Sequence, residues 1–133
     1  MPTYADSAQL YDTARHLFNR IQAEIPGAAN QVMGSRLLIR LQTSDPAGEI
    51  WINGRQRPLA TAFGPARSRP DLDITLPADT LHRILLGELS LKKALGNGNV
   101  QVRGPVWKAK ALADLFYHGQ SIYPQVLQEQ GLG

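Results

Sequence analysis

Hydrophobic and polar positions alternate in three stretches of the chain, which is the pattern of half-buried strands. The clearest stretch is residues 72–76, where three apolar residues alternate with Asp and Thr. Residues 36–42 and residues 100–103 show the same alternation. We therefore predict three strands here, each with one apolar face and one face toward water.

A fourth and a fifth strand are predicted as a hairpin over residues 50–63. Asn53-Gly54 separates two apolar runs and favours the positive φ angles of a type I′ turn. The register that this turn sets places Trp51 on one face of the sheet and five other side chains on the opposite face. Those five are Ile50, Ile52, Leu59, Thr61 and Phe63.

Apolar residues spaced three and four apart predict five helices. Asp6 or Ser7 can cap the first helix, and Gly87 suits the end of the second. The expected ranges are residues 7–25, 77–87, 90–95, 106–118 and 124–131. The last of these, in the C-terminal tail, is expected to pack on its own domain. Closing a cavity and docking on a partner or a second copy are the alternatives.

A helical wheel that starts at Val106 gives the fourth helix one broad apolar side. The residues on that side are Val106, Ala109, Leu112, Ala113, Leu115 and Phe116. Trp107 falls on the opposite side, with Lys110, Asp114 and His118. Lys108 is the exception, because the wheel places it between Leu112 and Leu115.

The order of elements between Leu72 and Phe116 resembles the sterol carrier protein 2 domain family. Four pieces carry the resemblance, and they are Asp73-Ile74-Thr75-Leu76, the Asp79 helix closed by Gly87, the Ala94 helix, and Gly98-x-Val100-x-Val102-x-Gly104. The resemblance extends more loosely back to about Leu10. It implies a single α+β domain over residues 1–133, with a core at about residues 10–118 and a helical tail at 119–133. The implied fold is a five-stranded mixed sheet covered on one face by helices, with an apolar cavity between the layers.

The same resemblance implies a function, because domains of this family hold sterols, fatty acids, acyl-CoAs or phospholipids in such a cavity. We therefore expect non-catalytic binding or transfer of a lipid or another long-chain hydrophobic ligand. Eight apolar residues are expected to line the cavity, with ordinary core packing equally open for each of them. These are Leu59, Phe63, Leu81, Ile84, Leu85, Leu112, Leu115 and Phe116.

Lys108 is the ninth candidate for ligand binding. Its ammonium could meet the carboxylate or phosphate of a bound amphiphile, or its stem could cover apolar surface while the charge reaches water.

The alternative function is an interaction, accessory or dimerisation module. Sterol carrier domains take that form in alkylsulfatases and in accessory proteins of quinone biosynthesis, which the resemblance also covers.

Charge is concentrated in the middle of the chain. The net charge is +3, and residues 36–110 hold 12 Lys and Arg against 6 Asp and Glu. A basic segment of this kind could make transient contact with a membrane surface, although an ordinary solvated face explains it as well. Aromatic residues are not interleaved with the basic ones, so we predict no nucleic-acid binding.

The candidate chemistry is sparse. The chain has no cysteine, which excludes disulfides and thiolate metal sites, and no apolar run is long enough to span a membrane. Since residues 1–6 do not resemble a secretory leader, a cytoplasmic location is expected. His16, His82 and His118 match no nucleophile or metal spacing, and His118 with Asp114 is a one-turn pair of the kind usually found on surfaces. We predict no enzyme activity, no cofactor and no metal.

Overall fold

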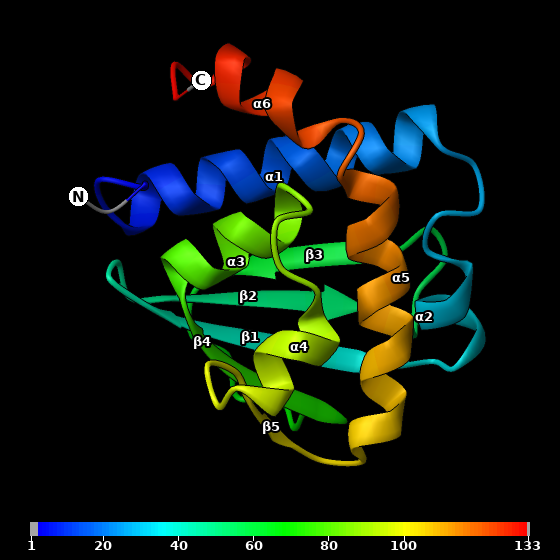
Figure 1. Cartoon of the computed structure of the whole chain (residues 1–133). Coiled ribbons are helices and arrows are strands. Elements are labelled where there is room, and N and C mark those ends of the chain that lie inside the picture. Colours follow the sequence, from blue (N-terminus) through cyan, green and yellow to red (C-terminus); the bar gives the residue numbers. More distant parts are fainter. Residues whose placement is uncertain (1–2, 133) are drawn as a thin grey trace.

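The alternating stretches form a five-stranded mixed sheet in a computed structural model that describes residues 3–132 (Figure 1). The strands are β1 (Leu38–Ser44), β2 (Gly48–Asn53), β3 (Ala60–Phe63), β4 (Leu72–Pro77) and β5 (Gln101–Arg103). Their order across the sheet is β3-β2-β1-β4-β5. The two middle strands, β1 and β4, run parallel, and the other neighbours are antiparallel. The predicted α+β class with a mixed sheet is confirmed.

Helices cover one face of this sheet (Figure 1). They are α1 (Ser7–Glu24), α2 (Asn30–Gly34), α3 (Ala78–Leu85), α4 (Leu91–Gly96), the 3-10 turn η1 (Val106–Lys108), α5 (Ala109–Gly119) and α6 (Tyr123–Glu129). The short α2 was not predicted. Between residues 3 and 132, none of the helices combines the length and apolar character needed to cross a bilayer.

The apolar core lies between the sheet and the helices. Every second residue of β1 and β4 points into it, including Ile39, Leu41 and Ile74, each no more than 1% exposed. The stripe of α1 meets the same core, and this helix begins where the Asp6 side chain accepts a hydrogen bond from the Gln9 amide at 2.9 Å. Burial of apolar surface from both layers is therefore the main source of stability.

The hairpin prediction is correct in the faces on which the side chains lie, and it is wrong in its turn and therefore in its pairing register. Ile50 pairs with Phe63 and Trp51 with Ala62, so the predicted faces hold. However, six residues (54–59) join the two strands instead of a two-residue turn. Gly54 is required for close packing rather than for a positive φ, because a Cβ atom there would lie 2.5 Å from the Val32 carbonyl oxygen of α2.

The wheel prediction for the last long helix holds from Ala109 onward. Leu112, Leu115 and Phe116 are each at most 2% exposed. Residues 106–108 form a 3-10 turn, whose tighter winding changes the direction of the side chains that precede α5. Val106 is consequently 56% exposed, where the wheel placed it on the apolar side, and Trp107 is 76% exposed, as the wheel placed it.

The opposite face of the sheet carries an ion-pair cluster. Arg40 donates hydrogen bonds to Asp73 and Glu49, and Gln42 donates to Asp73 at 2.8 Å. The hydrogen bonds from Arg40 hold the pKa of the Asp73 carboxyl below its usual value. Part of the positive charge of the middle segment is thus neutralised on this face.

Candidate functional site

The predicted ligand-binding residues of the helices lie together in the buried layer. Leu81, Ile84 and Leu85 come from α3, and their exposed fractions do not exceed 5%. The α5 residues Leu112, Leu115 and Phe116 are still more deeply buried, and both helices belong to one apolar core. The layer of apolar side chains exists as predicted. An apolar cavity within it stays a prediction.

The two residues predicted from the sheet, Leu59 and Phe63, lie in other parts of that core, and Phe63 lies against α1. Phe63 is half-buried, its ring centroid lies 5.6 Å from that of Tyr11, and the Arg15 guanidinium carbon stands 4.8 Å from its centroid. Leu59 is buried just before β3. Lys108 lies at the other end of the molecule, in η1, where its Nζ is 5.5 Å from the ring centroid of Trp107. The nine predicted residues therefore do not converge on one point.

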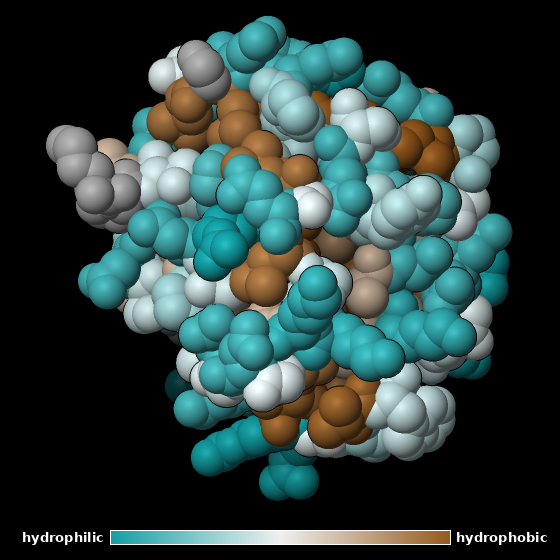
Figure 2. Space-filling model, viewed as in Figure 1, coloured by the Kyte–Doolittle hydropathy of each residue, from teal (hydrophilic) through white to brown (hydrophobic). Residues whose placement is uncertain are grey.

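An apolar groove of about 530 Å³ opens between α4 and the segment formed by η1 and α5. Its lining residues are Leu91, Lys92, Leu95, Val106, Trp107, Ala109, Lys110 and Ala113. Ala109 and Ala113 lie one turn apart on α5, and their small side chains leave room opposite the leucines of α4. In Figure 2 the groove lies at the hydrophobic surface seen near the lower edge, beside the beginning of α5.

None of the nine predicted residues lines this groove. Its sequence signal was present in the apolar positions of residues 90–95 and in the paired alanines of α5. That signal could not be interpreted without knowing that α4 and η1 lie side by side.

The groove combines apolar walls with a cationic rim. Lys92 and Lys110 contribute to its lining, and Lys108 is their neighbour beside Trp107. Within residues 3–132, no carboxylate oxygen lies within 4.0 Å of these three amines. Such a site suits a molecule with a long apolar body and an anionic end.

A second polar cluster joins the two ends of the chain. The hydroxyl groups of Tyr4 and Tyr123 are hydrogen-bonded to each other, and the Tyr123 hydroxyl lies 2.6 Å from Nδ1 of His82. Burial raises the pKa of Tyr4 to about 12, raises the pKa of Tyr123 and lowers the pKa of His82. All three groups are therefore neutral near pH 7, and the cluster holds α6 and the N-terminal segment to α3.

This cluster predicts that stability falls in mild acid. The folded state lowers the pKa of His82 below the usual 6.5, so the unfolded chain binds the proton more readily. The free energy of unfolding should therefore be highest above pH 6.5 and should decrease as the pH falls through the lowered pKa. Urea denaturation between pH 5 and 8 measures this, and His82→Asn should flatten the curve in that range. An unchanged slope in the variant would exclude His82 as the cause.

The remaining candidate chemistry is on the surface. Nε2 of His118 lies 3.6 Å from Oδ2 of Asp114, and about a third of each side chain is exposed. Neither residue lines the groove between α4 and α5. Among the described residues, no group of three or more His, Asp or Glu side chains could hold a metal ion.

Tail helix α6 packs on its own domain, along α1 (Figure 1). Glu129 accepts a hydrogen bond from Arg20 and lies 2.5 Å from Nε2 of His16, so it ties the end of α6 to α1. Val126 and Leu127 are buried beneath it. The expectation of packing on the domain itself is met for residues up to 132.

Comparisons with known proteins identify the fold and the family. The sterol carrier protein domain 2 of Helicoverpa armigera has a similar structure, with a TM-score of 0.67 and 16% identity over 85% of this chain and 89% of that chain. The palmitated SCP2L2 of Aedes aegypti gives a TM-score of 0.58 and 18% identity, over 80% of this chain and 92% of that chain. The UbiJ-SCP2 ubiquinone synthesis protein gives a TM-score of 0.62 and 14% identity, over 80% of this chain and 87% of that chain.

At these identities the structural matches establish the fold alone, and no curated protein sequence matches the chain. Membership of a family is established instead by the sequence. Residues 18–117 match the family described as the SCP-2 sterol transfer family, a stretch that contains the sheet, the end of α1 and most of α5. This match confirms the resemblance seen in the strand and helix order of residues 72–116. The chain therefore belongs to the SCP-2 sterol transfer family.

Proposed function

We propose that this protein binds a long-chain lipid non-covalently and carries or presents it without transforming it. The observation that supports this proposal most is the apolar groove of about 530 Å³ between α4 and α5. Its volume lies within the roughly 300–1,000 Å³ typical of small-molecule sites. Membership of a sterol transfer family and the palmitated state of one structural neighbour point in the same direction.

The hydrophobic effect alone can supply the affinity. Burying an acyl chain of about 16 carbons contributes roughly 12 kcal/mol, at about 0.8 kcal/mol per methylene. Association costs about 4 to 15 kcal/mol in lost freedom of motion. At the low end of this cost the net gain is about 8 kcal/mol, which corresponds to a micromolar dissociation constant without any catalytic or covalent contact.

The buried layer is the proposed continuation of the groove. Helix α4 is only six residues long, and two of its side chains, Leu91 and Ala94, are buried. Gly87 and Gly98, both with positive φ, lie in the connections on either side of it. A small displacement of α4 would let the ligand reach the layer formed by α3 and α5, where Leu85 and Leu112 lie. This route accounts for the predicted lining residues of both helices.

The test is a titration of delipidated protein with palmitate, followed by calorimetry. Saturable binding of one palmitate per chain is expected. Binding that never saturates, or that is equal for palmitate and a short-chain acid, would contradict the proposal.

Lys108 is proposed to attract the anionic head of the ligand from its position beside the groove. Lys108→Met removes the charge while keeping most of the apolar stem. We expect palmitate to bind roughly five-fold more weakly, the effect of about 1 kcal/mol for a solvent-exposed pair, and hexadecanol to bind as before. Equal losses for the acid and the alcohol would show that the charge of Lys108 makes no contribution.

An interaction or accessory role is the second candidate, and the likeness to the UbiJ-SCP2 ubiquinone synthesis protein favours it. The surface that the sequence suggested for such a role, on the tail helix, is less suited to it. Tyr123, Val126 and Leu127 of α6 are all buried against their own domain. A stable complex with a protein, in material that contains no lipid, would support this second role.

A further inference from the structure

We propose that one edge of the molecule docks on the surface of an anionic lipid bilayer. This docking edge consists of Lys92 on α4, Val106, Trp107 and Lys108 in η1, and Lys110 on α5. The proposal rests on the proposed lipid-binding function, because it assigns the place where the ligand enters and leaves.

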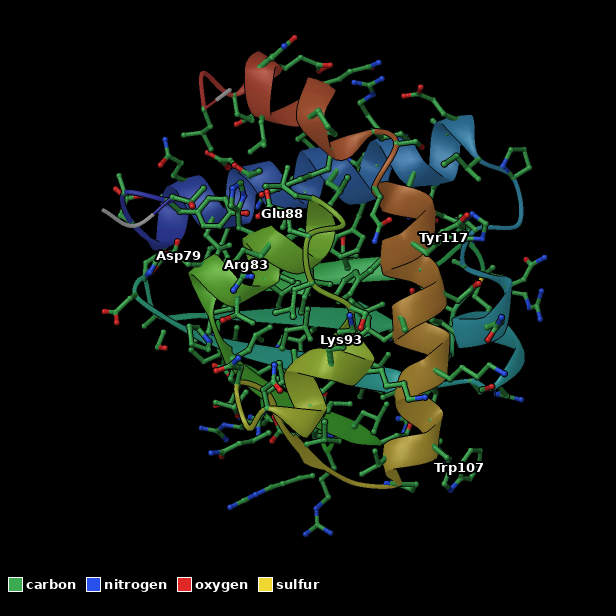
Figure 3. All side chains as sticks on the ribbon, viewed as in Figure 1. Asp79, Arg83, Glu88, Lys93, Trp107 and Tyr117 are labelled. Carbon is green, nitrogen blue, oxygen red and sulfur yellow. The ribbon has the colours of Figure 1, made fainter. Side chains whose placement is uncertain are left out.

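The first observation is the exposure of two large apolar side chains next to each other. Trp107 is 76% exposed and Val106 is 56% exposed, whereas the second tryptophan, Trp51, is 3% exposed. In Figure 3 Trp107 points away from the body of the molecule at the beginning of α5. An exposed tryptophan that borders an apolar groove is typical of a contact surface, and indole rings prefer the boundary between bilayer and water.

The second observation is the charge around these side chains. Lys92 and Lys110 line the groove beside Trp107, and Nζ of Lys108 lies over the indole ring. Within residues 3–132, none of these amines forms an ion pair with a carboxylate oxygen closer than 4.0 Å. Each such lysine near an anionic bilayer contributes an attraction that corresponds to about a five-fold increase in binding.

Helix α1, the longest helix of the domain, has a different surface. Arg15 is paired with Asp12 at 2.8 Å, and Arg20 is paired with both Glu24 and Glu129. Its outer face is therefore mixed in sign, and it does not complement an anionic surface. The charge pattern of the molecule thus favours the docking edge over α1.

The position of the groove supplies a reason for docking at this edge. Trp107 and Val106 belong both to the docking edge and to the lining of the groove. When the indole enters the interfacial region, the mouth of the groove faces the acyl chains. A lipid can then move between bilayer and protein without exposing its apolar chain to water.

The experiment is co-sedimentation of the intact protein with vesicles. We expect binding to vesicles of phosphatidylcholine mixed with phosphatidylglycerol, and little binding to phosphatidylcholine alone. Added salt should weaken the binding, because it screens the lysines. Tryptophan fluorescence should shift to the blue on binding, and Trp107→Phe, which keeps the buried Trp51, should abolish that shift.

Two double variants with the same change in net charge locate the contact. Lys92→Gln with Lys110→Gln should lower the partition coefficient by roughly 30-fold, five-fold for each lysine. Arg67→Gln with Arg69→Gln, on the exposed loop between β3 and β4, should change it much less. Equal losses in the two double variants, no binding to the mixed vesicles, or a dimer that buries Trp107 would each overturn the proposal.

Binding of hexadecanol in solution separates this proposal from the proposed function. The alcohol carries no charge, so its binding to the wild-type protein reports on the groove without any contribution from an anionic group. If hexadecanol and palmitate do not bind at all but the vesicle contact depends on Lys92 and Lys110, the docking edge stands and the groove is not a ligand site. If both ligands bind and the vesicle contact is absent, the docking edge is wrong and the lipid site remains.

Discussion

Ala113→Trp is expected to weaken palmitate binding by more than a factor of ten. Ala113 is half-buried and lines the groove on α5, where an indole would occupy the space opposite Leu91 and Leu95. Excluding two or three methylenes of the acyl chain, at about 0.8 kcal/mol each, corresponds to roughly ten- to fifty-fold in affinity. Titration calorimetry of delipidated protein gives this ratio directly.

Ala23→Trp is the matched control, because Ala23 is an exposed alanine on α1 that does not line the groove. It should bind palmitate like the wild type. Both variants should melt close to the wild-type temperature, since neither indole replaces a fully buried side chain. Wild-type affinity in Ala113→Trp would show that the groove does not hold the ligand.

Gly104→Ala is expected to destabilise the protein by about 3 kcal/mol or more, through strain and a steric clash. Gly104 has a φ angle of +114°, which side chains rarely allow. An added Cβ atom would also fall well inside van der Waals contact with the carbonyl oxygen of Asp71. The Asp71 side chain accepts a hydrogen bond from the Leu38 amide at 2.8 Å, so the clash would reach the start of the parallel pair β1 and β4.

Gly98→Ala separates the two causes, because Gly98 has a similar positive φ, +77°, and nothing within 4 Å of the added Cβ atom. Gly98→Ala should lower the free energy of unfolding by only about 1 to 2 kcal/mol, which is the penalty for a side chain in the left-handed backbone conformation. Urea denaturation of both variants measures the difference. Equal costs would mean that the contact with Asp71 is relieved by movement of the backbone.

The sheet and most helices could be predicted because each carries its own periodicity. Leu72, Ile74 and Leu76 alternate whatever their partners are, and the apolar side of α5 from Ala109 onward follows from helical geometry alone. The turn between β2 and β3 could not be predicted in this way. Asn53-Gly54 is a typical hairpin signal, but Gly54 is needed where the chain passes the Val32 carbonyl of α2, a contact between distant parts of the sequence.

The candidate site depends even more on such distant contacts. Its outline is set by the distance between α4 and η1, and by the 3-10 turn that directs Trp107 and Val106 outward. The hydrogen bond between the hydroxyls of Tyr4 and Tyr123 joins residues 119 positions apart, and the hydrophobic periodicity of the sequence does not indicate it. Sequence reasoning therefore found the buried residues of α3 and α5 correctly and missed the groove beside them.

Native mass spectrometry of the protein purified from cells without detergent tests the central claim most directly. The account predicts a main species heavier than the bare chain by the mass of one long-chain lipid, released as an intact molecule when the complex is activated. The same preparation of Ala113→Trp should be largely free of this lipid. A wild-type spectrum that shows only the bare chain, even after incubation with lipid vesicles, would contradict the account.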